Sequence, residues 1–177
     1  MGGLVGFFSF HNSVYNCSAT GTVKGNSCVG GLIGDGYAMK EIKNCYSTGD
    51  VIAKGSFVGG IIGRTSNSND TDITGCYSTG NISGVERVGG GMGLCDTILS
   101  LSDCYSTGNI SGQKDVGGVV GYLFWMRGPM TGCSSQGRVS GDTNIGGLVG
   151  QISSFLDLSI DNLSLIHISE PTRLRCI

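Results

Sequence analysis

Two short phrases recur along the chain every 28 to 31 residues, and this period constrains the fold more than any other feature. The first phrase contains a cysteine and reads CYSTG in three of its copies, whereas the second has the form Gly-Gly-x-x-Gly. A constant period in this range indicates a repeat architecture in which neighbouring copies stack. The cysteines of the first phrase are Cys17, Cys45, Cys76, Cys104 and Cys133. The glycine phrases begin at Gly2, Gly30, Gly59, Gly89, Gly117 and Gly146.

The two phrases keep a fixed distance from each other in one direction only. Each cysteine lies 13 residues before the next Gly-Gly pair, except that 14 residues separate Cys45 from Gly59. The return from the glycine phrase to the next cysteine varies between 11 and 13 residues. Insertions therefore collect in the returning segment, which the pattern predicts to be a surface loop.

Composition and alternation both favour an all-β fold. Glycine accounts for 33 of the 177 residues and proline for only two. So much glycine disfavours long helices because ordering glycine costs the most backbone entropy, and a mean hydropathy of +0.14 argues against disorder. In CYSTGDV, residues 45–51, small or apolar residues alternate with aromatic and polar ones. A period of two is typical of a strand with one buried face.

A unit of about 29 residues with two strand-like phrases cannot bury its apolar face alone, so the copies must stack. We therefore predict a parallel β-solenoid of about five repeats of 28–31 residues, with rungs about 4.8 Å apart. A leucine-rich horseshoe fits less well because its leucine frame and its Asn ladder are missing, and a propeller blade needs about 40 residues. The repeated apolar positions should form one ladder, made by Val23, Val51, Ile82, Ile110 and Val139.

Three stretches resemble the GLUG motif, a repeat found in bacterial surface proteins such as IgA-peptidase-like and filamentous-haemagglutinin-like proteins. They are NCYSTGDVIAKGSFVGGIIG at residues 44–63, GCYSTGNISGVERVGGGMG at 75–93 and DCYSTGNISGQKDVGGVVG at 103–121. The resemblance covers roughly residues 1–162. It implies a secreted or cell-surface stalk or display array, with any catalytic domain elsewhere in the protein.

The last 15 residues depart from this pattern. They read LSLIHISEPTRLRCI, residues 163–177, and contain neither phrase, although the next cysteine is due near position 163. This segment resembles a translated sequencing adapter, so we expect a non-native or disordered tail. Residues 1–162 are expected to form the repeat array, as a fragment of a longer protein.

The recurring cysteines are predicted to be structural. Stacked parallel rungs would hold their Cβ atoms about 4.8 Å apart, farther than the about 3.5–4.5 Å of a disulfide. No C-x-x-C pair points to a metal site. A ladder of reduced thiols is therefore expected at Cys17, Cys45, Cys76, Cys104 and Cys133. A disulfide involving Cys28 or Cys95, which lie outside the ladder, is left open.

The sequence predicts no catalytic residue, metal site or cofactor. Only two histidines are present, and both the P-loop pattern and the nucleophile elbow are missing. A net charge of −2 gives no basic surface for nucleic acid, and no apolar stretch is long enough to span a membrane. Carboxylates could meet across rungs, as in glycosidases, which is a weaker alternative. These are Asp35, Asp50, Glu86, Asp103 and Asp115.

One predicted surface feature could bind a partner. If the alternation holds, Tyr46, Tyr77 and Tyr105 form an outward aromatic row that could dock a host or cell-surface glycan or protein, or could merely strengthen the sheet. We therefore expect a non-enzymatic extracellular module acting as a stalk or adhesion scaffold. The alternative is a β-helical accessory part of a secreted peptidase or carbohydrate-active enzyme whose active site lies outside this chain.

Overall fold

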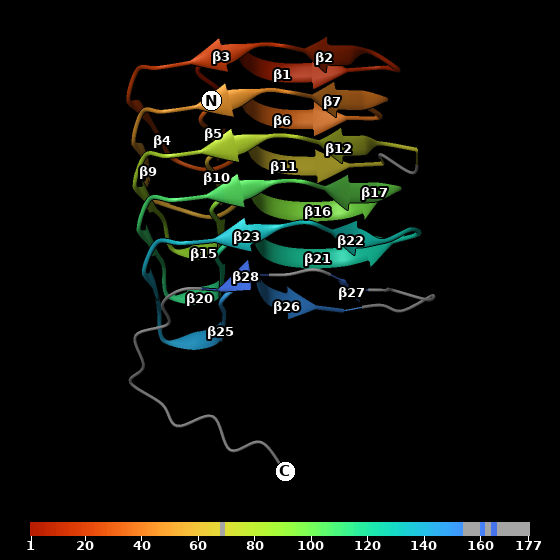
Figure 1. The fold of residues 1–177 in the computed structure, drawn as a ribbon. Coiled ribbons are helices and arrows are strands. Elements are labelled where there is room, and N and C mark those ends of the chain that lie inside the picture. Colours follow the sequence, from red (N-terminus) through yellow and green to blue (C-terminus); the bar gives the residue numbers. More distant parts are fainter. Residues whose placement is uncertain (68–69, 154–159, 162–163, 166–177) are drawn as a thin grey trace.

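The chain winds into a stack of rungs, each of which lies over the next with its strands in parallel (Figure 1). The computed structural model describes residues 1–67, 70–153, 160–161 and 164–165. Every strand pairing in this described part is parallel, and no helix occurs in it. The predicted all-β parallel solenoid of about five repeats is therefore confirmed.

Each of the first five rungs contributes one strand to each of five sheets, numbered in the order in which the chain visits them, and β26, β27 and β28 add a sixth strand to the first three. Sheet 1 contains β1 (Val5–Ser9), β6 (Ile33–Tyr37), β11 (Ile62–Ser66), β16 (Met92–Ile98), β21 (Val120–Met126) and β26 (Val149–Ile152). Sheet 2 contains β2 (Ser13–Tyr15), β7 (Glu41–Lys43), β12 (Asp72–Thr74), β17 (Ser100–Ser102), β22 (Met130–Thr131) and β27 (Ile160–Asp161). Sheet 3 contains β3 (Ser18–Ala19), β8 (Tyr46–Ser47), β13 (Tyr77–Ser78), β18 (Tyr105–Ser106), β23 (Ser134–Ser135) and β28 (Ser164–Leu165).

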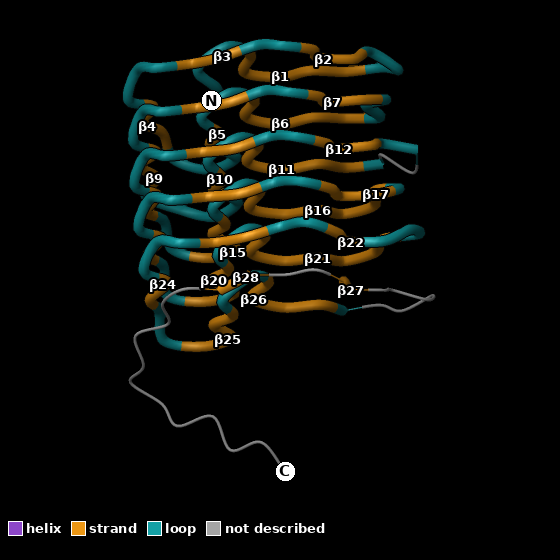
Figure 2. Tube along the Cα trace, in the orientation of Figure 1, coloured by secondary structure: helices purple, strands orange, loops and turns teal. Residues whose placement is uncertain are grey.

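The remaining two sheets close the rung. Sheet 4 contains β4 (Val23–Gly25), β9 (Val51–Ala53), β14 (Ile82–Ser83), β19 (Ile110–Ser111) and β24 (Val139–Ser140). Sheet 5 contains β5 (Val29–Gly30), β10 (Val58–Gly59), β15 (Glu86–Gly89), β20 (Lys114–Gly117) and β25 (Thr143–Gly146). Short strands alternate with turns throughout each rung (Figure 2). The repeat thus has five strands, where the sequence suggested two strand-like phrases.

Residues with positive φ recur at equivalent positions of successive rungs and include the following two columns. One column immediately precedes the recurring cysteine and includes Asn44 at φ 54° and Gly75 at φ 63°. The other precedes the inward valine of sheet 5 and includes Phe57, Arg87 and Asp115, at φ 66°, 57° and 54°. Asn and Asp tolerate this conformation better than other side chains do, so these corners are not marked by glycine alone.

Equivalent residues of successive repeats lie directly over one another, as the period predicts. In sheet 4, Val51 pairs with Val23 and with Ile82, and the ladder continues through Ile110 to Val139. Beside it, the Tyr77 amide donates to the Cys45 carbonyl over 3.0 Å. The predicted apolar ladder is confirmed.

The rung encloses two separate apolar cores. The larger one lies between sheet 1 and sheets 2 and 3 and contains Ile33, Ile73 and Cys104. The smaller one lies between sheets 4 and 5 and contains Val58 and Ile82. Both are built from side chains that repeat once per rung, so the cores run the length of the stack.

Buried serines join the two walls where these cores meet. Ser78 donates to the Gly90 carbonyl and Ser106 to the Gly118 carbonyl, each over 2.5 Å. A Cβ on Gly90 would lie 2.3 Å from the Ser106 oxygen and 2.0 Å from the Gly118 carbonyl oxygen. These contacts explain why the spacing between the cysteine phrase and the Gly-Gly pair is fixed, since a serine must meet a glycine across the rung.

Ser47 occupies the one repeat in which this spacing is 14 rather than 13 residues. Its hydroxyl is buried and has no hydrogen-bond partner in the described part of the chain. Ser78 is equally buried at the same position of the next rung, but its hydroxyl is bonded. The extra residue thus coincides with a lost hydrogen bond.

Ser78→Ala should lower the free energy of unfolding by about 1 kcal/mol, the net value of one buried hydrogen bond. Ser47→Ala should leave it unchanged or raise it, because that change removes a buried hydroxyl with no partner. Urea unfolding of the two variants beside the parent protein measures both effects. An equal decrease in the free energy of unfolding of the two variants would contradict the assignment of a hydrogen bond to Ser78 and none to Ser47.

A ladder of hydrogen bonds from backbone amides to Asp and Asn side chains, which was not predicted, also joins the rungs. The Asp50 carboxylate accepts the Asn81 amide at 2.8 Å, Asn81 Oδ1 accepts the Asn109 amide at 3.1 Å, and Asn109 Oδ1 accepts the Arg138 amide at 3.1 Å. It lies between sheets 3 and 4, outside any leucine-rich frame.

The segment predicted to be a non-native or disordered tail, residues 163–177, is described only at Ser164–Leu165, which form β28 and pair with β23. Residues 163 and 166–177 lie outside the described part of the chain.

Candidate functional site

The three predicted tyrosines form a stacked column on the outside of sheet 3. The Tyr46 and Tyr77 ring centroids are 5.0 Å apart with planes 5° from parallel, and those of Tyr77 and Tyr105 are 4.8 Å apart and 1° from parallel. In-register pairing of β8, β13 and β18 sets this geometry. The pKa of Tyr77 is raised above its ordinary value, mainly because its hydroxyl is partly desolvated and to a lesser degree because Tyr105 and Tyr46 lie beside it.

This stacking limits what the column can bind. Each face of the Tyr77 ring lies against a neighbouring ring, so the outward side of the row presents ring edges and hydroxyls. A sugar ring that stacks on an aromatic side chain needs an uncovered face. The arrangement therefore fits ring–ring stabilisation of the sheet better than sugar stacking.

The predicted thiol residues also follow one column. Cys45, Cys76, Cys104 and Cys133 are buried and Cys17 is half-buried, and all five are free thiols. Each Sγ donates to the backbone carbonyl two residues earlier, for example Cys45 to Lys43 at 3.2 Å and Cys104 to Ser102 at 3.2 Å. Hydrogen bonds with Cys133 and Cys76, together with burial, raise the pKa of Cys104 well above its ordinary value.

Among the residues that the structure describes, two cysteines lie outside the column, Cys28 and Cys95, and both are free. Burial raises the pKa of Cys95 to about 12 and raises that of the half-buried Cys28 to a smaller extent. The possible disulfide involving Cys28 or Cys95 is therefore not formed.

Thiol labelling of the native protein should divide the described cysteines into two classes. Cys17 and Cys28 should react with iodoacetamide, whereas the buried thiols should react only after unfolding, because the fold shields their sulfur atoms from the reagent. The buried set is Cys45, Cys76, Cys95, Cys104 and Cys133. Peptide mass mapping gives the labelling rate of each residue. Native labelling of Cys76 as fast as that of Cys17 would contradict the buried ladder.

The acidic residues considered as a catalytic pair have other partners. Asp35 receives two hydrogen bonds from Arg64, Glu86 lies 3.5 Å from the Lys114 ammonium, and Asp115 accepts from Asn144 at 2.7 Å. Asp50 belongs to the Asn ladder, and Asp103 is exposed. In the described part of the chain, no three His, Cys, Asp or Glu side chains gather where they could hold a metal ion.

A groove on the outside of sheet 1 was not predicted. We call it the sheet 1 groove, and it is lined by Arg64, Ser66, Arg87, Leu94, Asp96, Tyr122 and Phe124. Leu94 pairs with Arg64 on one side and with Tyr122 on the other, so a shorter side chain lies between two longer ones and forms the floor. The groove has a volume of about 320 Å³.

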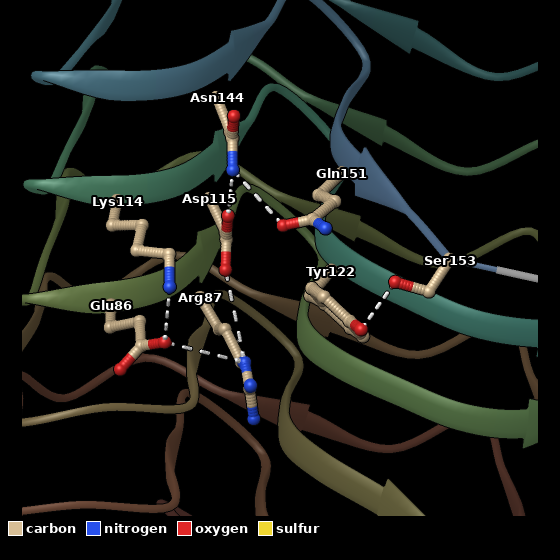
Figure 3. A network of polar contacts seen from close by, with 8 residues as sticks. All are labelled: Glu86, Arg87, Lys114, Asp115, Tyr122, Asn144, Gln151 and Ser153. Carbon is tan, nitrogen blue, oxygen red and sulfur yellow. Dashed lines mark hydrogen bonds and ion pairs between the residues drawn. The ribbon is translucent and has the colours of Figure 1, made fainter.

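Arg87 forms one wall of this groove and is held between aromatic rings. Its guanidinium carbon lies 5.2 Å from the Phe57 ring centroid and 4.6 Å from that of Tyr122. Glu86 and Asp115 approach its Nε only to 3.8 and 3.9 Å (Figure 3). Within the described residues, Arg87 Nε and the Asp115 Oδ2 atom have no hydrogen-bond partner, although both are buried.

Arg64, which also lines the groove, is paired with Asp35. It donates to Asp35 from Nε at 3.0 Å and from a terminal nitrogen at 2.5 Å, and these hydrogen bonds raise the pKa of Arg64. Tyr122 is likewise held, because its hydroxyl is hydrogen-bonded to Ser153. The walls of the groove are therefore fixed by contacts within the protein.

The sequence did carry a signal for this groove. The segment after the glycine phrase reads GYLFWM at residues 121–126 but GRTSNS at the equivalent 63–68. The first copy, GFFSFH at residues 6–11, also carries three aromatic residues, so these residues mark a local surface only together with the register that shows what lies beside them.

Residues 25–52, which run from the end of β4 into β9, match the family model of the GLUG motif. The chain carries the GLUG motif. The match contains one Gly-Gly-x-x-Gly phrase and one CYSTG phrase, so the motif corresponds to one rung that starts at sheet 5 and ends in sheet 4. The predicted resemblance is confirmed.

This GLUG-repeat chain is also similar to Halomucin of Haloquadratum walsbyi, with 42% identity over 88 residues. The alignment covers 46% of this chain and 1% of Halomucin, so the chain spans a very small part of that relative. No solved structure matches. None of the described residues forms a helix that could cross a membrane.

Proposed function

We propose that the chain is a non-enzymatic GLUG-repeat module of an extracellular, cell-surface protein, where it acts as a stalk or display scaffold for adhesion. The similarity to a segment of Halomucin supports a place in a large repeat-containing protein. The observation that carries the scaffold role is the continuous register, in which hydrogen-bonded ladders follow all five sheets from one rung to the next.

This architecture suits a stalk for a physical reason. Each rung adds about 4.8 Å along the axis, and every rung after the first is held by backbone hydrogen bonds to the one before it. Adding repeats therefore lengthens the module without changing its cross-section. Side chains at each rung then appear on the outside at a constant spacing, which is what a display array needs.

Surface labelling tests the proposal. An antibody raised against this chain should label intact, unpermeabilised cells that produce the protein, and external protease should remove the signal. Labelling that appears only after permeabilisation would contradict the proposal. An antibody against a cytoplasmic protein of the same cells controls for leakage.

A further inference from the structure

We propose that the sheet 1 groove binds one ring of a neutral saccharide, with Phe124 and Leu94 beneath the ring and Asp96 and Arg87 at its hydroxyls. This inference rests on the proposed surface function and names a site for it. It places ligand binding on sheet 1, across the rung from the tyrosine row.

The distribution of polar and apolar groups carries the first step. Leu94 forms the floor, and Tyr122 and Phe124 form one end. Phe124 is 43% exposed, so part of its ring is open to a ligand. A pyranose presents a face of C–H groups and a rim of hydroxyls. An apolar floor bordered by charged groups matches both parts of such a ring.

The charges around the groove carry the second step. Two cationic side chains line it, namely Arg64 and Arg87, whereas Lys114 lies farther out and contacts Glu86. Four carboxylates line it or contact these arginines, namely Asp35, Glu86, Asp96 and Asp115. An anionic ligand would therefore gain no net attraction, whereas hydroxyls can accept from a guanidinium and donate to a carboxylate.

The third step concerns which polar groups remain available. Asp96 lines the groove, and across the described residues its carboxylate makes no hydrogen bond or ion pair. Arg87 makes only two long ion contacts through Nε, at 3.8 and 3.9 Å. Arg64, in contrast, is committed to Asp35. Asp96 is thus the acceptor and Arg87 the donor that the hydroxyls of a ligand would meet.

Preorganisation carries the last step. Arg87 is fixed between Phe57 and Tyr122, and Tyr122 is bonded to Ser153, as seen in Figure 3 for the tyrosine and its partner. Groups already held in place lose little conformational entropy when a ligand binds. In the tyrosine row, both faces of Tyr77 and one face each of Tyr46 and Tyr105 are covered by neighbouring rings, so the groove is the better site for a sugar ring.

A printed array of neutral and acidic oligosaccharides, followed by titration of the strongest neutral ligand, tests this inference. We expect binding to neutral glycans, with Kd raised at least tenfold by Phe124→Ala and by Asp96→Asn. Two controls should keep Kd within about twofold. One is Trp125→Ala, a similarly exposed aromatic on the same strand that does not line the groove. The other is the triple change Tyr46→Ala, Tyr77→Ala and Tyr105→Ala.

Binding to acidic glycans alone, no binding to any neutral glycan, or a loss confined to the triple tyrosine variant would overturn the inference. Circular dichroism of each variant separates loss of binding from loss of fold. The surface-labelling experiment is independent of this one. If cells are labelled and neutral glycans do not bind, the groove inference fails while the proposed function stands.

Discussion

Gly80→Ala should destabilise the solenoid by about 3 kcal/mol, near the upper end of what overpacking costs. Gly80 is the fourth residue after Cys76, and a Cβ there would lie 2.1 Å from the Gly49 carbonyl oxygen and 2.9 Å from the Asp50 nitrogen. All the atoms it would meet belong to the backbone of the preceding rung. They cannot move aside without breaking the ladder that joins the two rungs, so the clash must be relieved by separating them.

Gly21 provides a matched control at the same position of the first described rung. A Cβ on Gly21 would have no atom within 4 Å, and the residue does not have a positive φ. Gly21→Ala should therefore leave stability unchanged or raise it by up to about 1 kcal/mol through the unfolded state. Thermal and urea unfolding of both variants measure the difference. Similar losses at the two positions would show that these glycines are required for backbone flexibility and not for close packing of rungs.

Ile82→Ala should lower the free energy of unfolding by about 2–5 kcal/mol, the range for removing a large apolar side chain from a packed core. Ile82 is 1% exposed in the smaller core and stacks between Val51 and Ile110. Each rung contributes one buried residue from sheet 4 and one from sheet 5 to this core. The neighbours of Ile82 therefore have little freedom to move into the cavity that the substitution would leave.

Ile52→Ala is the control for this prediction, since Ile52 lies in the adjacent rung of the same sheet but is 41% exposed. We expect Ile52→Ala to lower the free energy of unfolding by less than about 0.5 kcal/mol, as for other surface substitutions. Urea midpoints at constant slope compare the two variants directly. If Ile52→Ala proved as costly as Ile82→Ala, the inward and outward faces of sheet 4 would be assigned wrongly.

The sequence was sufficient for the period, the parallel stacking and the apolar ladder, because each depends on residues that recur once per rung. Val51 and Ile82 align for the same reason that Cys45 and Cys76 do. The five separate strands were harder to predict. The alternation from Cys45 to Val51 continues through a corner at Thr48 to Asp50, where β8 has ended and β9 has not begun. Period-two patterning alone does not show such a break.

The sheet 1 groove could not be predicted for a different reason. It depends on one short side chain, Leu94, that lies between Arg64 and Tyr122 of neighbouring rungs. Those three residues each follow the last glycine of a Gly-Gly-x-x-Gly phrase, so a repeat alignment stacks them, but it does not show the hollow that their different lengths create. Arg87 adds a second difficulty, because it reaches the groove from a positive-φ corner that no glycine marks. Local surfaces of a solenoid therefore come from the irregular residues that a repeat analysis averages out.

The central claim is that each repeat pairs in parallel and in register with the next. Scalar couplings across hydrogen bonds, measured between amide nitrogens and carbonyl carbons in labelled protein, test it most directly. Couplings should join Tyr77 to Cys45 and Tyr105 to Cys76, whose nitrogen–oxygen distances are 3.0 and 3.1 Å. Couplings that instead joined residues within one repeat, in the alternating pattern of an antiparallel hairpin, would contradict the solenoid and the scaffold function built on it.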